Sequence, residues 1–213
     1  MSEHGATTVY VVDDDQLVLA IIVDLLESAG YQPQAFASPF EFLEKLDPLR
    51  PGCLVLDLRM PGMGGMEVLQ RLEMLGARVH TVLLSGQGDV SAAVSAMQAG
   101  AVDFVEKPFR PDRLLATVER AIKASLAASA KAQVMQAQKA IALLDLSDRE
   151  ILTAAGHGES PDAAAVRLGV PPSLIEGAWQ RILVQLGTTD IADAIEIARS
   201  AGLFTNNKIE VAE

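Results

Sequence analysis

Short apolar runs alternate with segments of helical periodicity through the first half of the chain, and this alternation restricts the fold more than any other feature. The predicted strands cover residues 8–12, 54–56, 81–84 and 102–105, with a weaker one near 34–37. The predicted helices cover residues 16–29, 65–75 and 90–99, and another begins at Asp112. Strands that are apolar throughout are typical of a parallel sheet covered by helices on both faces. The first half therefore predicts an α/β domain with five parallel strands and right-handed crossovers.

Residues 121–142 have a different composition, because nine of the 22 are alanine and none is glycine or proline. Alanine has the highest intrinsic helix propensity, so we expect the last helix of the α/β domain to continue as a long helical linker. Four apolar residues in and before this segment have helical spacing: Leu115, Val118, Ile122 and Leu126. They form either a dimer seam or part of the packing against the sheet.

No strand pattern follows Leu146, and the remainder predicts four short helices. Ser147 is the predicted N-cap of the first, with Glu150 completing a capping box. The next two follow Ser160-Pro161 and the segment 170–173, and the last covers 191–201. The brief connection near 169–173 predicts a helix-turn-helix arrangement. The expected domains are residues 1–125, a linker over 126–145, and an all-α domain over 146–213.

The charge balance and the cysteine count exclude several classes of protein. The net charge of -11 argues against nonspecific affinity for nucleic acid or anionic lipid. No apolar run approaches the ~18 residues of a membrane helix, and the first residues lack the pattern of an export signal. Cys53 is the only cysteine, so it predicts a small buried apolar residue in a reducing cytoplasm and no internal disulfide. Three scattered histidines exclude a His/Cys metal cage.

Charged and hydroxyl side chains follow the predicted strands. The first strand is followed by Asp13, Asp14 and Asp15, the third by Asp57, the fourth by Ser85 and the fifth by Lys107. Open parallel sheets bind ligands at the carboxyl ends of their strands, so we expect these side chains to converge. Neighbouring carboxylates repel one another, and a hard dication such as Mg²⁺ relieves that repulsion. A lysine and a hydroxyl opposite a metal predict a phosphoryl-transfer site, where an aspartate can be the covalent acceptor.

Four motifs occur in this half: VDDD at 12–15, LDLRMPGMGG at 56–65, SGQGD at 85–89 and AGAVDFVEKPF at 99–109. With these motifs, residues 8 to about 125 resemble the receiver domain of two-component response regulators of the FixJ/NarL type. The resemblance implies a flavodoxin-like, five-stranded parallel sheet in the order 2-1-3-4-5. It also implies a phosphoprotein, not an enzyme acting on a small molecule, because receiver chemistry accounts for the acidic crevice.

The resemblance assigns a role to each motif residue. Asp57 would accept a phosphoryl group from a sensor histidine kinase. The implied Mg²⁺ ligands are Asp14, Asp57 and the backbone carbonyl of Arg59, with Asp13 acting through a water molecule. Ser85 and Lys107 would bind the phosphoryl oxygens. Phe104 would be an aromatic switch, with simple core packing as the alternative. Homodimerisation on phosphorylation is expected.

The C-terminal part also carries motifs: LSDREIL at 146–152, AVRLGV at 165–170, LG at 186–187 and AGL at 201–203. With these, residues 147–204 resemble the LuxR/FixJ-type DNA-binding domain, in which 173–186 would be the recognition helix. The candidate DNA contacts are Gln180, Arg181 and Gln185.

Two features of this region depart from the family pattern. Arg181 is the only basic residue of the recognition helix, and residues 141–213 contain five basic against eleven acidic residues. Phosphate contacts normally supply much of the affinity for DNA. Trp179, Leu183 and Val184 either widen the core or form a protein-docking surface. The sequence therefore predicts a phosphorylation-controlled transcription regulator, with a protein-binding output domain as the alternative.

Overall fold

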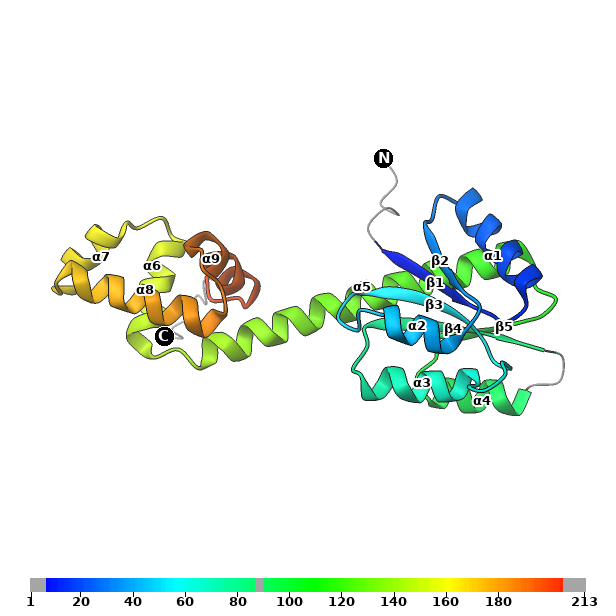
Figure 1. Cartoon of the computed structure of the whole chain (residues 1–213). Coiled ribbons are helices and arrows are strands. Elements are labelled where there is room, and N and C mark those ends of the chain that lie inside the picture. Colours follow the sequence, from blue (N-terminus) through cyan, green and yellow to red (C-terminus); the bar gives the residue numbers. More distant parts are fainter. Residues whose placement is uncertain (1–6, 87–89, 205–213) are drawn as a thin grey trace, which may run out of the picture. The chain divides into compact units, whose positions relative to one another are not determined.

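Five parallel strands form one sheet in the order β2-β1-β3-β4-β5 (Figure 1). They are β1 (Thr8–Val12), β2 (Pro33–Phe36), β3 (Gly52–Asp57), β4 (Val79–Ser85) and β5 (Asp103–Glu106). The structure is a computed structural model that describes residues 7–86 and 90–204. Its strand order is the one that the receiver resemblance implies. The Gln87–Asp89 part of the third motif lies outside the described residues.

Helices cover both faces of this sheet, and the strand side chains alternate between the two. One face carries α1 (Gln16–Ser28) and α5 (Pro111–Ala142); the other carries α2 (Pro39–Lys45), α3 (Gly65–Met74) and α4 (Val90–Gln98) (Figure 1). Within β1, Val9 and Val11 belong to the core under α1 and α5, whereas Tyr10 and Val12 belong to the opposite core. Burial on both faces explains why these strands are apolar throughout.

The sequence interpretation missed α2. This helix has only seven residues, too few for an apolar periodicity to stand out. Its start is nevertheless well specified: Ser38 is the N-cap, its side chain accepts a hydrogen bond from the backbone N–H of Phe40, and Pro39 follows at the first helical position. Phe42, a residue of this helix, is fully buried.

The long helix predicted from the alanine-rich segment is confirmed, because α5 continues for 32 residues. The chain divides into two compact units, Met1–Ser129 and Ala130–Glu213, so α5 contributes to both. In the first unit, Val118 is in the core, and Leu115 and Ile122 pack against it. Leu115, Val118 and Ile122 therefore take part in the packing against the sheet, whereas Leu126 is 44% exposed and lies outside this core. In the second unit, Ala137 and Ile141 of α5 are buried.

Four helices complete the second unit: α6 (Leu146–Gly156), α7 (Pro161–Leu168), α8 (Pro172–Leu186) and α9 (Ile191–Ser200). Residues 169–171 join α7 to α8, which gives the predicted helix-turn-helix arrangement. Gly169 and Gly187 end their helices with φ of 64° and 69°, in the left-handed region that favours glycine. The centre of this unit's core is formed by residues that are fully or almost fully buried: Leu152, Ile175 and Ile182.

The predicted N-cap of α6 was wrong by two positions. Asp145 caps the helix through a 2.7 Å hydrogen bond from the backbone N–H of Asp148, and the Ser147 hydroxyl donates to the same carboxylate at 2.7 Å. Ser147 and Glu150 therefore do not form the capping box. A charged Asp satisfies the first free N–H groups of the helix at least as well as a serine does.

In the described ranges, no helix combines the length and apolar character needed to cross a membrane.

Candidate functional site

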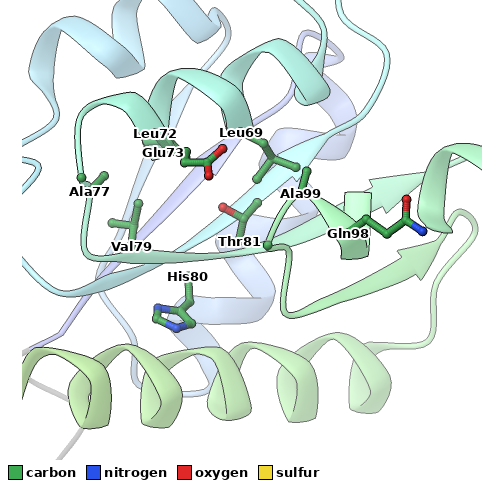
Figure 2. Close-up of a pocket in the computed structure, with 11 residues that line it drawn as sticks. Leu69, Leu72, Glu73, Ala77, Val79, His80, Thr81, Gln98 and Ala99 are labelled. Carbon is green, nitrogen blue, oxygen red and sulfur yellow. The ribbon is translucent and has the colours of Figure 1, made fainter. Parts of the chain in front are cut away.

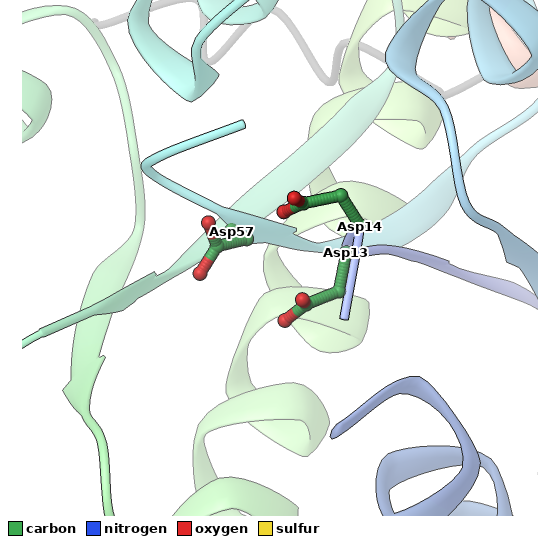
Figure 3. Close-up of side chains that lie close together, drawn as sticks. All are labelled: Asp13, Asp14 and Asp57. Atoms are coloured by element: carbon green, nitrogen blue, oxygen red, sulfur yellow. The ribbon is translucent and has the colours of Figure 1, made fainter. Parts of the chain in front are cut away.

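Three aspartates meet where β1 and β3 end (Figure 3). Val12 is in register with Leu56, so the residues that follow, Asp13 and Asp57, lie on neighbouring strands. One oxygen from each of Asp13, Asp14 and Asp57 lies within 4.8 Å of the others. Asp13 and Asp57 are buried and Asp14 is exposed. The convergence predicted from the strand ends is therefore present for Asp13, Asp14 and Asp57, but not for Asp15.

Lys107 joins this cluster from the end of β5. Its Nζ donates to Oδ2 of Asp13 at 2.6 Å and to Oδ1 of Asp57 at 2.5 Å. Its backbone N–H donates to the carbonyl of Ser85 at 2.7 Å, which fixes the start of the lysine side chain beside β4. Residues 94 positions apart in the sequence thus form direct ion pairs.

Burial and pairing act in opposite directions on these charges. Burial raises the pKa of Asp13, while the hydrogen bonds from Lys107 and from the backbone of Asp15 oppose the rise. Burial alone would lower the pKa of Lys107, but its hydrogen bonds with Asp13 and Asp57 outweigh that effect, and the pKa is raised overall. Lys107 is therefore a fixed positive charge at neutral pH.

The loop after β3 fixes the carboxylate of Asp57. The backbone N–H of Arg59 donates to Oδ2 of Asp57 at 2.8 Å, while Lys107 binds Oδ1. The sequence interpretation assigned only the carbonyl of Arg59 to the site and did not predict this hydrogen bond. Gly65 lies so close to the end of β3 that a Cβ there would be 2.7 Å from the carbonyl oxygen of Asp57. Glycine at 65 therefore lets the start of α3 approach the phosphoacceptor candidate.

Two other predicted site residues lie on β4 and β5. Ser85 is the last residue of β4 and is buried. Phe104 lies on β5 in register with Leu83, and its side chain is 37% exposed. Simple core packing therefore does not describe Phe104 in this structure.

The third aspartate after β1 has a separate role. Oδ1 of Asp15 accepts hydrogen bonds from the backbone N–H groups of Leu17 at 2.9 Å and Val18 at 3.3 Å, so Asp15 is the N-cap of α1. An aspartate directly before an apolar helical period is a recognised N-cap signal, and it was available in the sequence. The triplet therefore divides into a buried partner of Lys107, an exposed carboxylate and a helix cap.

The pocket in Figure 2 lies elsewhere on the same unit. It has a volume of about 510 Å³ and is lined by α3, α4 and the first residues of β4, at the opposite end of that strand from Ser85. Leu69 and Leu72 line it, and His80 points away from them (Figure 2). Burial lowers the pKa of His80, against the effect of a hydrogen bond with the Arg78 backbone. None of the predicted site residues lines this pocket.

Comparison with known families identifies the first unit. Residues 9–119 match the response regulator receiver domain. The chain belongs to the response-regulator family. It is a response regulator of a two-component system, a class of protein that works with sensor kinases.

Similarity to other response regulators extends over both units. This response regulator is 34% identical over 199 residues to the transcriptional regulatory protein FixJ of Bradyrhizobium diazoefficiens, covering 93% of this chain and 97% of that protein. The solved structure of the response regulator StyR has a TM-score of 0.62 at 30% identity, covering 91% of this chain and 98% of that one. The solved structure of full-length FixJ from B. japonicum has a TM-score of 0.55 at 34% identity, covering 92% of this chain and 98% of that one.

The three candidate DNA contacts of the response regulator lie on α8 and are exposed, but Arg181 is already paired. Its Nη2 donates to Oδ1 of Asp148 at 2.6 Å, and its Nε donates to Oδ2 at 3.1 Å. Asp148 is only 3% exposed, so the guanidinium of Arg181 covers a buried carboxylate. Gln180 and Gln185 are exposed neutral side chains.

The apolar residues of α8 divide between core and surface. Trp179 is buried in the core, and Leu183 packs against it. The interpretation of a wider core is therefore confirmed for these two residues. Val184 is 82% exposed and lies outside the core.

Proposed function

We propose that Asp57 accepts a phosphoryl group from a sensor histidine kinase and that its phosphorylation controls transcription through the C-terminal unit. One observation carries the proposal: Lys107 binds Asp13 and Asp57 together at the carboxyl ends of three strands. The proposed domains are a receiver over 1–125, a linker over 126–145 and an output domain over 146–213, in a cytoplasmic protein.

The transfer requires one bond to form and one to break. An oxygen of Asp57 attacks the phosphorus, and the bond from phosphorus to the imidazole nitrogen of the kinase breaks, leaving the electron pair on that nitrogen. Lys107 holds a positive charge beside the acceptor oxygen throughout, because its pKa is raised. In the acyl phosphate, Lys107 and the Ser85 hydroxyl would donate to the phosphoryl oxygens.

The carboxylates fit a divalent cation. Three oxygen ligands within 4.8 Å of one another, with one ammonium for three carboxylates, are the donor set and charge that Mg²⁺ prefers. Asp14, Asp57 and the carbonyl of Arg59 would hold the ion, and Asp13 would act through a water molecule. A bound Mg²⁺ would neutralise charge on the transferred phosphoryl group.

The switch is proposed to involve Phe104. Phosphorylation adds about -1.5 to -2 charges and three acceptor oxygens, which attract Ser85 and Lys107. A shift of Ser85 toward the phosphoryl group would leave room for the half-exposed ring of Phe104 to turn inward. Val94 and Met97 of α4 are also exposed, and together with Phe104 they offer an apolar surface for the proposed homodimer.

The kinase is proposed to dock beside the phosphoacceptor. A pocket of about 460 Å³ is lined by Val18 and Ile21 of α1 and by the segment Lys107, Pro108 and Phe109. Leu17 and Ile21 are 70% and 51% exposed. An apolar surface that includes the active-site lysine suits a helix of the kinase that must present its histidine to Asp57.

Control of transcription rests on relatives and on the helix-turn-helix. FixJ, similar over almost the whole chain, is a transcriptional regulatory protein by name. Gln180, Arg181 and Gln185 are the proposed DNA contacts on α8.

A second candidate output is binding to a protein, and one observation favours it. In the described residues from 143 to 204, the Lys and Arg residues are four arginines, each paired within the unit. Arg149 donates to the carbonyls of Ala142 and Leu144, Arg167 binds Glu150 and Glu159, Arg181 binds Asp148, and Arg199 binds Glu196. Phosphate recognition would compete with all four pairings.

Phosphorylation is tested by incubating the protein with acetyl phosphate and Mg²⁺ and measuring the mass of the intact chain. We expect one added phosphoryl group in the wild type and none in Asp57→Asn. Asp24→Asn, an exposed substitution on α1, is the matched control and should be labelled normally. Full labelling of Asp57→Asn would remove Asp57 from the proposed role.

The output is tested by selecting DNA from a random duplex library with the phosphorylated full-length protein. Selected sequences that bind with an affinity falling steeply with salt support direct DNA contact. No enrichment at any salt concentration would favour the protein-binding candidate.

A further inference from the structure

The second unit contains a groove that is separate from the candidate phosphorylation site. The groove has a volume of about 730 Å³ and lies between the C-terminal part of α5, the end of α8 and one face of α9. Its apolar lining includes Ala137, Ala140, Val184 and Ile197. It is therefore separate from Gln180 and Arg181, although Gln185 lines it.

The polar lining of this groove is neutral or acidic. Asp193 and Glu196 of α9 line it, together with glutamines at 133, 136 and 185, and no Lys or Arg is among the described lining residues. Asp193 accepts a hydrogen bond from Thr188, and Glu196 pairs with Arg199 one turn away. The groove thus presents a free carboxylate charge at Asp193 and a partly compensated one at Glu196.

We propose that this groove binds a helical segment of a partner protein whose apolar stripe is flanked by Lys or Arg. An apolar floor between helices is the usual receptor for an amphipathic helix, which inserts side chains spaced three and four residues apart. Charge complementarity selects the flanking residues, because the acidic side chains attract basic ones and repel nucleic-acid phosphates.

The side chain of Val184 is apolar surface that the fold itself leaves uncovered. Its side chain is 82% exposed beside the groove, although Leu183 and Leu186 on the same turn pack against the core. A partner that covers Val184 would bury apolar surface that the isolated chain leaves in water. The inference deepens the second candidate output, binding to a protein, and it holds whether or not α8 also contacts DNA.

The experiment measures the anisotropy of fluorescent model peptides titrated with the full-length protein. The probes are an amphipathic helical peptide of leucine and lysine and its counterpart of leucine and glutamate. We expect the lysine peptide to bind and the glutamate peptide to bind at least about tenfold more weakly. Equal binding of both peptides would overturn the proposal.

Variants locate the binding surface. Asp193→Lys should weaken binding of the lysine peptide about tenfold, and Val184→Ser should weaken it severalfold. Asp162→Lys is the matched control, because Asp162 lies in the first turn of α7 as Asp193 lies in the first turn of α9. It should change the affinity less than twofold, as expected for a charge reversal outside the groove.

Two results would contradict the proposal even if the lysine peptide binds. One is an Asp162→Lys variant that loses as much affinity as Asp193→Lys, since this would show attraction to net charge alone. The other is binding of a fluorescent DNA duplex that Val184→Ser weakens, which would assign the groove to nucleic acid. Glu196→Lys, outside the first turn of α9, provides a second variant if Asp193→Lys lowers the melting temperature.

Discussion

Two clusters in this response regulator pair a basic side chain with a buried carboxylate, and they differ in the balance of charge. In the first unit, Lys107 binds both Asp13 and Asp57, and Asp14 lies close by. In the second unit, Arg181 binds Asp148 alone, through two hydrogen bonds. In the first cluster one ammonium is shared between two carboxylates with a third close by, whereas in the second both hydrogen bonds of the guanidinium go to one buried carboxylate.

This difference separates a cluster with unpaired negative charge from a cluster whose charges are paired. The unmatched carboxylates of the first cluster can accept a divalent cation or an electrophile. The matched pair has no charge left to offer, and Arg181 cannot leave without exposing Asp148 as an unpaired buried charge. A basic residue on a predicted recognition helix is therefore weak evidence for DNA binding until its intramolecular partners are known.

The largest effect is expected from removing the cation of the unmatched cluster. Lys107→Gln should lower the rate of labelling by acetyl phosphate about a hundredfold, because a preorganised charge beside the reacting oxygen is lost. The rate is measured from intact mass over time. Lys45→Gln, on the exposed surface of α2, is the control and should keep the wild-type rate. An unchanged rate in Lys107→Gln would mean that the ion pairs in the structure do not assist the transfer.

The next effect concerns the matched pair. Arg181→Leu should lower the melting temperature of the second unit by several degrees, because Asp148 is left unpaired in the core. The double variant Arg181→Leu with Asp148→Leu should regain part of that loss, since no charge is then buried alone. Calorimetry measures both. If the single variant melts like the wild type, the pair is not the structural element described here.

A smaller effect is expected at Asp13, and it depends on pH. Burial raises the pKa of Asp13, so the folded state holds this proton more tightly than the unfolded state does. Stability therefore falls as the pH rises from 3.8 through the folded pKa and stays lower above it. Without divalent cations, Asp13→Asn should raise the free energy of unfolding at neutral pH by about 1 kcal/mol.

Urea denaturation of wild type and Asp13→Asn between about pH 4 and pH 7 measures this difference. Adding Mg²⁺ should stabilise the wild type more than the variant, because the ion offsets the repulsion that Asn removes. A variant that is less stable than the wild type at neutral pH in the presence of a chelator would contradict the expectation.

The smallest effect on stability is expected from two substitutions on α8. They test whether this helix would bind DNA if it carried more positive charge. Gln180→Lys with Gln185→Lys places two unpaired cations on an exposed surface and should change the unfolding free energy by less than about 0.5 kcal/mol. The dependence of DNA affinity on salt should steepen by roughly one unit in the logarithmic slope per lysine. Filter binding over a salt series measures the slope, and no change would show that α8 does not face DNA.

The sequence predicted the first unit more completely than the second. Strand periodicity and the residues that follow each strand were enough for the sheet and for the meeting of Asp13, Asp14, Asp57 and Lys107, because parallel strands bring their carboxyl ends to one edge. The short helix α2 was missed, since seven residues hold too little periodicity.

The second unit shows where such reasoning stops. The helices and their connection followed from capping and turn residues, but Asp145 replaced Ser147 as the N-cap. The pairing of Arg181 with Asp148 joins side chains 33 residues apart, and its geometry depends on how α6 and α8 pack. A count of charges showed a shortage of basic residues. Only the structure showed that the four arginines described between residues 143 and 204 are already bound to the chain's own groups.

Cys53 gives the first unit a natural reporter of its own opening. It is the only thiol in the chain, it is fully buried in β3, and burial raises its pKa, so a water-borne reagent reaches it only when α1 or α5 leaves the sheet. The rate of its alkylation under native conditions therefore measures how often the folded protein opens locally around Cys53. Comparing the alkylation rate before and after phosphorylation would show whether phosphorylation loosens or tightens the packing of α1 and α5 on the sheet, and no label need be introduced.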